Sequence, residues 1–176
     1  MRPAAFLDRD GTLIEDRGYA YRLGDYAPLP GAYEAVRLLR TAGFAVIVVS
    51  NQSGVGRGYF TRDDLERFEA HLRADFAAQG APLDALFSCP HAPAEGCACR
   101  KPATGMLERA RADHDLDLER SWVIGDKAID VELARRAGCR AARVLSGVEP
   151  APAAGAEPDL IVAADLLEAV RQILGA

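Results

Sequence analysis

The sequence predicts an α/β fold, a Rossmann-like three-layer sandwich in which helices cover both faces of a central parallel sheet. Residues 44–49 form an apolar run bounded by Gly43 and Ser50, and such a run is typical of a parallel strand covered on both faces. Similar runs alternate along the chain with segments whose apolar residues recur at helical spacing. A chain of 176 residues can bury a substantial core, so we expect a single domain over residues 1–176.

Each expected element rests on its own pattern. The strands are the apolar runs at residues 4–7, 44–49, 83–88, 121–125, 140–145 and 160–162. Apolar stripes predict helices over residues 31–42, 61–80, 105–114, 131–137 and 165–174. Thr61 and Asp64 resemble a capping box at the start of the second helix. A long loop is expected over residues 15–30, and a loop rich in Pro and Ala over 149–158.

Composition and charge exclude several classes of function. The formal net charge of −5 argues against a nucleic-acid-binding surface. The sequence has neither an apolar run of the roughly 18 residues that a membrane span needs nor a signal peptide at its start. Three of the four cysteines lie close to His91, which favours a metal site in a reducing compartment over disulfides. We therefore expect a cytoplasmic protein whose partners include neither nucleic acid nor membrane.

The first candidate site stands where the first strand ends. Asp8 follows the apolar run at residues 4–7, and Asp10 comes two positions later, so both carboxylates leave an extended backbone on the same side. Gly11 allows a sharp exit of the chain. Two acids so placed can divide the work, one as nucleophile or metal ligand and one as proton carrier. The alternative is an Asp-Gly turn without catalytic role, and motifs further along the chain decide between the two.

A glycine-rich segment, S-N-Q-S-G-V-G-R-G at residues 50–58, follows the second strand. Its glycines can let backbone N–H groups approach an anion, and its serine and asparagine side chains add donors. Open α/β sheets bind ligands beyond the carboxyl ends of their strands, which favours this function over a flexible turn. Residues 16–19 lie close behind the two acids and either line the same mouth or form a solvated loop.

The third strand leads into a loop with the spacing C-x-H-x5-C-x-C over residues 89–99. Two close pairs of nitrogen and sulfur ligands fill a tetrahedral zinc site completely, which is typical of structural rather than catalytic zinc. A bound metal would also stabilise one conformation of a loop that is rich in Pro, Ala and Gly. The sequence predicts structural Zn²⁺ held by Cys89, His91, Cys97 and Cys99.

Basic and acidic residues follow the next two elements. Arg100 and Lys101 come directly after the last cysteine of the loop, and this position favours contact with an anion over a solvated surface. Asp126 ends the strand at residues 121–125, and Lys127 follows it. Carboxylates from neighbouring strand ends offer the hard oxygen ligands that Mg²⁺ prefers.

In chain order, D-x-D-G-T, Ser50, Lys101 and G-D-x-x-x-D resemble the motifs of the haloacid-dehalogenase superfamily across nearly the whole chain. D-R-D-G-T, S-N-Q-S-G-V-G-R-G-Y-F-T, the Cys/His loop, C-R-K-P and G-D-K are similar to the heptose 1,7-bisphosphate phosphatase family. Histidinol-phosphate phosphatases share the zinc loop and its five-residue gap. The resemblance implies a capless, cytoplasmic, Mg²⁺-dependent phosphatase, usually monomeric, that removes the 7-phosphate of a small phosphorylated sugar.

The resemblance also implies roles for individual residues. Asp8 would form an aspartyl-phosphate, and Asp10 would carry protons to the leaving oxygen and from water. Asp8, the main-chain carbonyl of Asp10 and Asp126 would hold Mg²⁺, while Ser50 and Lys101 would hold the phosphoryl oxygens. The substrate would lie among Asp16, Arg17, Gly18, Tyr19, Ser50, Asn51, Gln52, Ser53, Arg100, Lys101 and Lys127.

Other functions are compatible with parts of the pattern. The zinc loop favours histidinol phosphate as substrate, whereas the segment after the second strand favours heptose bisphosphate. A zinc-stabilised binding module would need no pair of acids at a strand end. A phosphotransferase or mutase of the same fold generally needs a cap domain, and no segment is long enough for a large one. For the second phosphate of a bisphosphate, the basic candidates are Arg57, Arg100 and Lys127.

Overall fold

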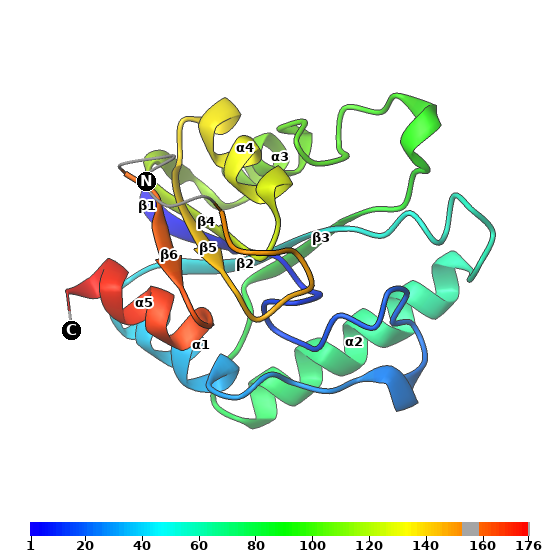
Figure 1. The fold of residues 1–176 in the computed structure, drawn as a ribbon, viewed down its shortest axis with the longest axis horizontal. Helices are drawn as coiled ribbons and strands as arrows, with labels where there is room; N and C mark the ends of the chain where they lie inside the picture. The colour runs from blue at the N-terminus through cyan, green and yellow to red at the C-terminus, as the bar shows by residue number, and fades with distance from the viewer. Residues whose placement is uncertain (153–158, 176) are drawn as a thin grey trace.

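The computed structural model describes residues 1–152 and 159–175, and its centre is a six-stranded parallel sheet (Figure 1). The strand order is β3-β2-β1-β4-β5-β6. The strands are β1 (Arg2–Leu7), β2 (Ala45–Asn51), β3 (Ala85–Cys89), β4 (Leu116–Gly125), β5 (Arg140–Val144) and β6 (Ile161–Ala163). The predicted parallel sheet is confirmed.

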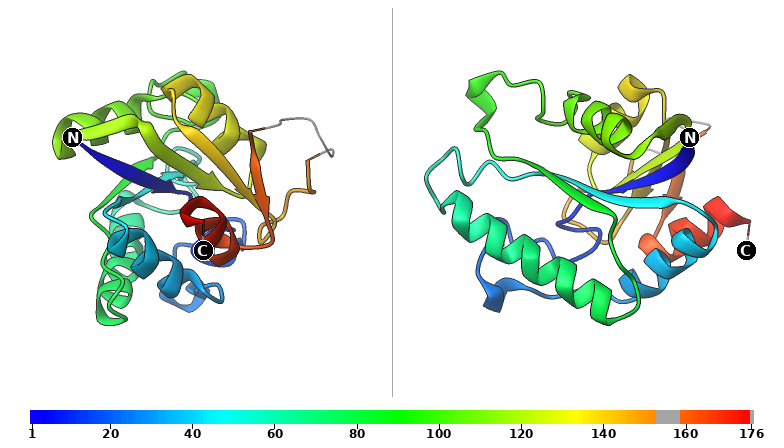
Figure 2. Two further views of the ribbon diagram at one scale, coloured as in Figure 1. Left: turned by 90° about the vertical axis from the view of Figure 1, so that its left-hand side faces the viewer. Right: turned by 180° about the vertical axis from the view of Figure 1, so that it is seen from behind.

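Helices form a layer on each face of the sheet (Figures 1 and 2). One layer consists of α1 (Ala32–Thr41), α2 (Arg62–Ala78) and α5 (Leu166–Leu174), and the other of α3 (Gly105–His114) and α4 (Ala128–Ala137). Short 3-10 turns occur at η1 (Leu23–Asp25) and η2 (Pro93–Glu95). The predicted three-layer sandwich is therefore confirmed. Among the described residues, no helix is long and apolar enough to cross a membrane.

The capping box predicted at the start of α2 is present. The Oγ1 of Thr61 accepts a hydrogen bond of 3.1 Å from the N–H of Asp64, and the Asp64 carboxylate accepts one of 2.9 Å from the N–H of Thr61. Because both backbone groups would otherwise lack partners, the pair fixes the residue at which the helix begins.

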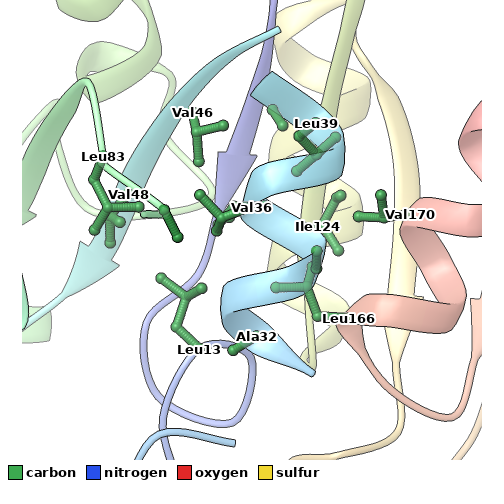
Figure 3. Packing of buried hydrophobic residues seen from close by; sticks show 14 of the residues in the cluster. Leu13, Ala32, Val36, Leu39, Val46, Val48, Leu83, Ile124, Leu166 and Val170 are labelled. Atoms are coloured by element: carbon green, nitrogen blue, oxygen red, sulfur yellow. The ribbon is translucent and has the colours of Figure 1, made fainter. Parts of the chain in front are cut away.

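The core lies between the sheet and the two helix layers. Along β1, Ala5 and Leu7 pack toward α1, α2 and α5, whereas Ala4 and Phe6 pack toward α3 and α4. This alternation explains why an uninterrupted apolar run forms a strand, since both of its faces are buried. Figure 3 shows the first of these cores, where side chains of α1 and α5 meet those of β2 and β4.

Most strand boundaries lie within two residues of the predicted ones, and the start of β4 differs most. β4 begins at Leu116, five residues before the predicted run, because Leu116 pairs with Arg2 ahead of an irregularity in the ladder. At that irregularity, the Oγ of Ser121 accepts a hydrogen bond of 2.8 Å from the N–H of Ala4 and takes the place of a backbone carbonyl of the neighbouring strand. The spacing of apolar residues in the sequence gives no sign of such a side-chain partner. Of the loop expected over 149–158, residues 149–152 form neither helix nor strand, and 153–158 lie outside the described residues.

The topology fixes the place of the site. From β1 the chain builds β2 and β3 on one side and then returns to build β4 on the other. A crevice forms beyond the carboxyl ends of the strands where the direction of winding reverses. β1 and β4 are neighbours, and the N–H of Asp8 donates to the carbonyl of Ile124 across 2.9 Å. Asp8 and Asp126 therefore leave adjacent strand ends, as the sequence predicted.

Candidate active site

A cavity of about 570 Å³ opens at the carboxyl ends of the strands. Most of the predicted substrate-binding residues line it, although they come from four separate segments of the chain. The lining contains Asp8, Asp10, Asp16, Gly18, Tyr19, Ser50, Asn51, Gln52, Ser53, Arg100, Lys101 and Lys127, together with Ile129, Val148 and Glu149.

Asp8 is ionised at the floor of this cavity. The buried ammonium of Lys101 donates hydrogen bonds of 2.8 Å to Asp8, 2.6 Å to Asp130 and 3.1 Å to the carbonyl of Val49. Burial alone would raise the pKa of Asp8, but the charges of Lys101 and Lys127 hold it below its usual value. Burial likewise opposes the charge on Lys101, yet Asp130 and Asp8 raise the pKa of its ammonium. The site therefore presents a carboxylate beside a fixed positive charge.

Three buried carboxylates gather next to this ion pair. Oxygens of Asp8, Asp126 and Asp130 lie within 4.8 Å of one another. The buried Oδ2 of Asp126 accepts no hydrogen bond, although Lys127 Nζ lies 3.2 Å away. Burial and the negative charge of Asp8 raise the pKa of Asp126 to about 7, against the effect of Lys127. Clustered hard oxygens with an unsatisfied member fit Mg²⁺.

Asp10 has different surroundings from Asp8. Its carboxylate accepts two hydrogen bonds from Arg9, of 2.9 and 3.0 Å, and a third of 2.9 Å from Gln52. Its pKa is raised, first by burial, while Arg9 opposes the shift and Asp8 contributes less. Burial is therefore the main cause of the raised pKa of Asp10, and the negative charge of Asp8 is a minor one.

The basic residues of the mouth differ in their surroundings. Lys127 Nζ donates a hydrogen bond of 2.9 Å to Asp16, which ties the loop after β1 to the end of β4. Arg100 is half-buried and its Nη1 has no hydrogen-bond partner. Arg17 and Arg57 are both exposed and line no part of the cavity; Arg17 instead pairs with Glu15 across 2.7 Å.

The segment at residues 50–58 contributes side chains to the cavity. Ser50 Oγ accepts a hydrogen bond of 2.8 Å from Gln52, and residues 50–53 line the cavity. The N–H groups of Gly56 and Gly58 donate to the carbonyls of Pro90 and Val55. The anion-binding interpretation of these two glycines is therefore wrong, because their N–H groups stabilise a turn against the Cys/His loop instead.

The four predicted zinc ligands converge beside that turn. Cys89, His91, Cys97 and Cys99 offer one nitrogen and three sulfur atoms within 4.8 Å of one another. The neighbouring separations are 3.2 to 3.5 Å, as from His91 Nδ1 to Cys99 Sγ (3.2 Å) and from Cys89 Sγ to Cys97 Sγ (3.5 Å). Soft donors in this number and spacing fit tetrahedral zinc. The N–H of Lys101 then donates 2.9 Å to Asn51 Oδ1, so the exit of the loop is held against β2.

Sequence reasoning missed the segment at residues 146–149, of which Val148 and Glu149 line the cavity. Ser146 Oγ donates a hydrogen bond of 2.7 Å to the carbonyl of Gly11. A Cβ on Gly147 would lie 1.8 Å from Asp126 Oδ2, so only glycine fits there. Glu149 accepts the N–H of Ala128 at 3.0 Å. No strand-end acid marks this segment in the sequence. Arg9 was missed as well, although a charged residue between two site acids was an available signal.

Comparisons with known proteins agree with this geometry. The family model Hydrolase_like, described as HAD-hydrolase-like, matches residues 98–169. The chain is 44% identical over 188 aligned positions (98% of this chain, 95% of the relative) to a D-glycero-D-manno-heptose-1,7-bisphosphate 7-phosphatase of Thermosynechococcus vestitus. It is 39% identical over 147 positions (83% of each) to a D-glycero-beta-D-manno-heptose-1,7-bisphosphate 7-phosphatase of Pseudomonas aeruginosa.

Among solved structures, D,D-heptose 1,7-bisphosphate phosphatase from B. bronchiseptica, complexed with magnesium and phosphate, matches with a TM-score of 0.89, 33% identity and 98% coverage of both chains. The fold and the site thus define a phosphoric monoester hydrolase of the capless haloacid-dehalogenase type. Within that class, the chain belongs to the heptose 1,7-bisphosphate phosphatase family.

Proposed function

We propose that this protein removes the 7-phosphate of D-glycero-D-manno-heptose 1,7-bisphosphate through an aspartyl-phosphate on Asp8, with Mg²⁺ as cofactor. The observation that carries the proposal is the ionised Asp8 at the end of β1, held 2.8 Å from Lys101 at the floor of the cavity. Relatives that match most of this chain, and which are named for the same reaction, support the substrate.

Two half-reactions use the two acids of the first motif. In the first, an Asp8 oxygen bonds to phosphorus, the bond from phosphorus to the sugar oxygen breaks, and Asp10 gives its proton to that oxygen. In the second, water attacks the phosphorus of the aspartyl-phosphate, Asp10 takes the proton of that water, and Asp8 is released as a carboxylate. Burial favours the protonated form of Asp10 that the first step needs.

Further groups of the site would bind the metal ion and the phosphoryl oxygens. Asp8, the main-chain carbonyl of Asp10 and Asp126 would hold Mg²⁺, which when bound neutralises the repulsion between a carboxylate and a phosphate. The B. bronchiseptica phosphatase is complexed with magnesium and phosphate together, which supports this cofactor. Ser50 and Lys101 would bind the phosphoryl oxygens.

The rest of the substrate would contact Asp16, Gly18, Tyr19, Asn51, Gln52, Ser53, Arg100 and Lys127. Arg17 and Arg57 have no part in this proposal, because neither lines the cavity. Arg100 has a buried nitrogen without partner, and a guanidinium suits two-point recognition of phosphate. We therefore assign the second phosphate of the substrate to Arg100.

We further propose that Cys89, His91, Cys97 and Cys99 bind one structural Zn²⁺. The donors fit zinc in number and softness, and the loop exit holds Lys101 against Asn51. The zinc would thereby order the segment that carries both Arg100 and Lys101. We also propose that residues 1–176 act as one domain, monomeric and in the cytoplasm.

Histidinol phosphate is the second candidate substrate, because five residues separate His91 from Cys97. Phosphate release from heptose 1,7-bisphosphate, histidinol phosphate and a simple sugar monophosphate, each with and without Mg²⁺, decides between them. We expect Mg²⁺-dependent turnover with the highest kcat/KM on the bisphosphate. A higher kcat/KM on histidinol phosphate would overturn the substrate assignment, and no phosphate release from any of them would overturn the function.

A further inference from the structure

Arg9 is a buried arginine between the two acids of the first motif, and its side chain is only 1% exposed. An arginine cannot lose its charge inside a protein, so its burial requires compensating partners. Asp10 provides the negative charge through two parallel hydrogen bonds, from Nε at 2.9 Å and from Nη2 at 3.0 Å. This two-point contact fixes the plane of the Asp10 carboxylate and not only its distance.

Other parts of the fold fix the guanidinium itself. Nη2 also donates to the carbonyl of Ala20 at 2.9 Å and to Gln52 Oε1 at 3.1 Å. The ring of Phe68 on α2 lies beneath the guanidinium, 4.7 Å from its carbon to the ring centroid. Arg9 is thus anchored by the loop after β1, by the end of β2 and by α2. Asp10 is anchored mainly through Arg9 and Gln52.

We propose that Arg9 is a positioning residue that aims the Asp10 carboxyl group for proton transfer to the leaving sugar oxygen. When phosphorus transfers to Asp8, the bond to the sugar oxygen breaks with its electron pair on that oxygen, and the proton of Asp10 follows. The carboxylate that remains faces the N–H donors of Arg9 and Gln52, which stabilise it at that moment. This inference rests on the proposed function, because it needs Asp10 as the acid.

Lysine cannot replace arginine in this role. Its ammonium is a point charge that can hold one oxygen of Asp10 but cannot align both. Arg9→Lys therefore keeps a positive charge next to Asp10 and removes the alignment, which makes it the sharpest substitution at this position.

The leaving group separates positioning from general damage. A sugar oxygen needs a proton as it leaves, whereas p-nitrophenolate leaves without one. We would measure kcat/KM of Arg9→Lys on heptose 1,7-bisphosphate and on p-nitrophenyl phosphate, using single turnovers with enzyme in excess so that slow reactions are followed. We expect a loss of about 10–100-fold on the sugar phosphate, part of the 10²–10⁴-fold typical of general acid catalysis, and a loss at least tenfold smaller on the aryl phosphate.

Four further variants keep the result interpretable. Asp10→Asn should show the same dependence on the leaving group, and Arg9→Lys added to Asp10→Asn should cost less than about twofold more, because both act through one proton. Arg136 is exposed and paired with Glu132, so Arg136→Lys should leave kcat/KM on both substrates unchanged. If Arg9→Lys does not fold, Phe68→Leu removes the ring beneath the guanidinium. It should again lower kcat/KM more on the sugar phosphate than on the aryl phosphate, with a smaller loss on each.

The outcomes distinguish the role of Arg9 from that of Asp10. Equal losses on both substrates, or losses that multiply in the double variant, would overturn the positioning role while Asp10→Asn remains selective. If Asp10→Asn itself loses the same factor in kcat/KM on both substrates, Asp10 is not the acid, and the inference about Arg9 is then wrong as well.

Discussion

At the scale of single residues, the site depends on charges that are buried in matched sets. Lys101 stands between Asp8 and Asp130, with all three side chains at most 7% exposed. A buried charge that loses its partner costs far more than the pair contributes, because water no longer solvates it. The same ammonium that favours the anionic nucleophile thus also ties the end of β1 to the first turn of α4.

We predict that Lys101→Met will lower both activity and stability. Removing one partner of a buried ion pair costs about 3–5 kcal/mol of unfolding free energy, which urea unfolding at neutral pH measures. Arg136→Met, which breaks an exposed pair with Glu132, is the matched control and should cost less than about 1 kcal/mol. A cost for Lys101→Met as small as that of the control would show that the buried pair is not what holds this part of the fold.

Arg100 gives a second prediction at this scale, on substrate choice. Arg100→Ala should lose more kcat/KM on heptose 1,7-bisphosphate than on a sugar monophosphate, because the binding energy it removes comes from a phosphate that does not react. Steady-state kinetics of wild type and variant on both substrates give the comparison. If both substrates lose the same factor, Arg100 attracts phosphate in general and the discrimination lies elsewhere.

At the scale of elements, two loops pack against each other beyond the carboxyl ends of β2 and β3 (Figure 1). Gly56 donates to the carbonyl of Pro90 at 2.8 Å, so the turn after β2 rests on the Cys/His loop. A Cβ on Gly54 would lie 2.1 Å from the ring of Phe60, and one on Gly56 would lie 2.5 Å from the backbone nitrogen of Ala92. These glycines serve close packing.

We therefore expect Gly56→Ala to destabilise the protein by about 1–3 kcal/mol, the usual cost of overpacking. Gly24→Ala is the matched control, because nothing lies within 4 Å of its added carbon. Urea unfolding of both variants gives the two values. A stability of Gly56→Ala equal to that of the control would mean that the two loops separate freely.

The metal sites provide the other prediction at this scale. The Cys/His loop offers nitrogen and sulfur, whereas the strand ends offer only oxygen, so the two sites should sort metals by hardness. Brief treatment with EDTA should stop phosphate release, and Mg²⁺ should restore it while elemental analysis still finds one zinc per chain. Freshly purified protein without zinc would contradict the assignment of the loop.

At the scale of the whole molecule, apolar runs and the polar residues that end them predicted the strands and the neighbouring positions of Asp8 and Asp126. These signals are local, so they can be recognised in the sequence without knowledge of the fold. The contacts of Arg9 with Ala20 and Gln52 and the packing of residues 146–149 against the site join distant segments, as Ser146 does with Gly11. Periodicity and spacing carry no record of such contacts, which is why these features emerged only with the structure.

The proposed mechanism requires a covalent bond between the phosphoryl group and Asp8. An acyl-phosphate is reduced by borohydride to an alcohol, so quenching the enzyme during turnover and reducing it should convert Asp8 to homoserine, which peptide mass analysis detects. We expect this change at Asp8 alone, with none in Asp8→Asn or in enzyme without substrate. Reduction at Asp126 or Asp130 instead, or an unmodified Asp8 in enzyme that is turning over, would contradict the mechanism.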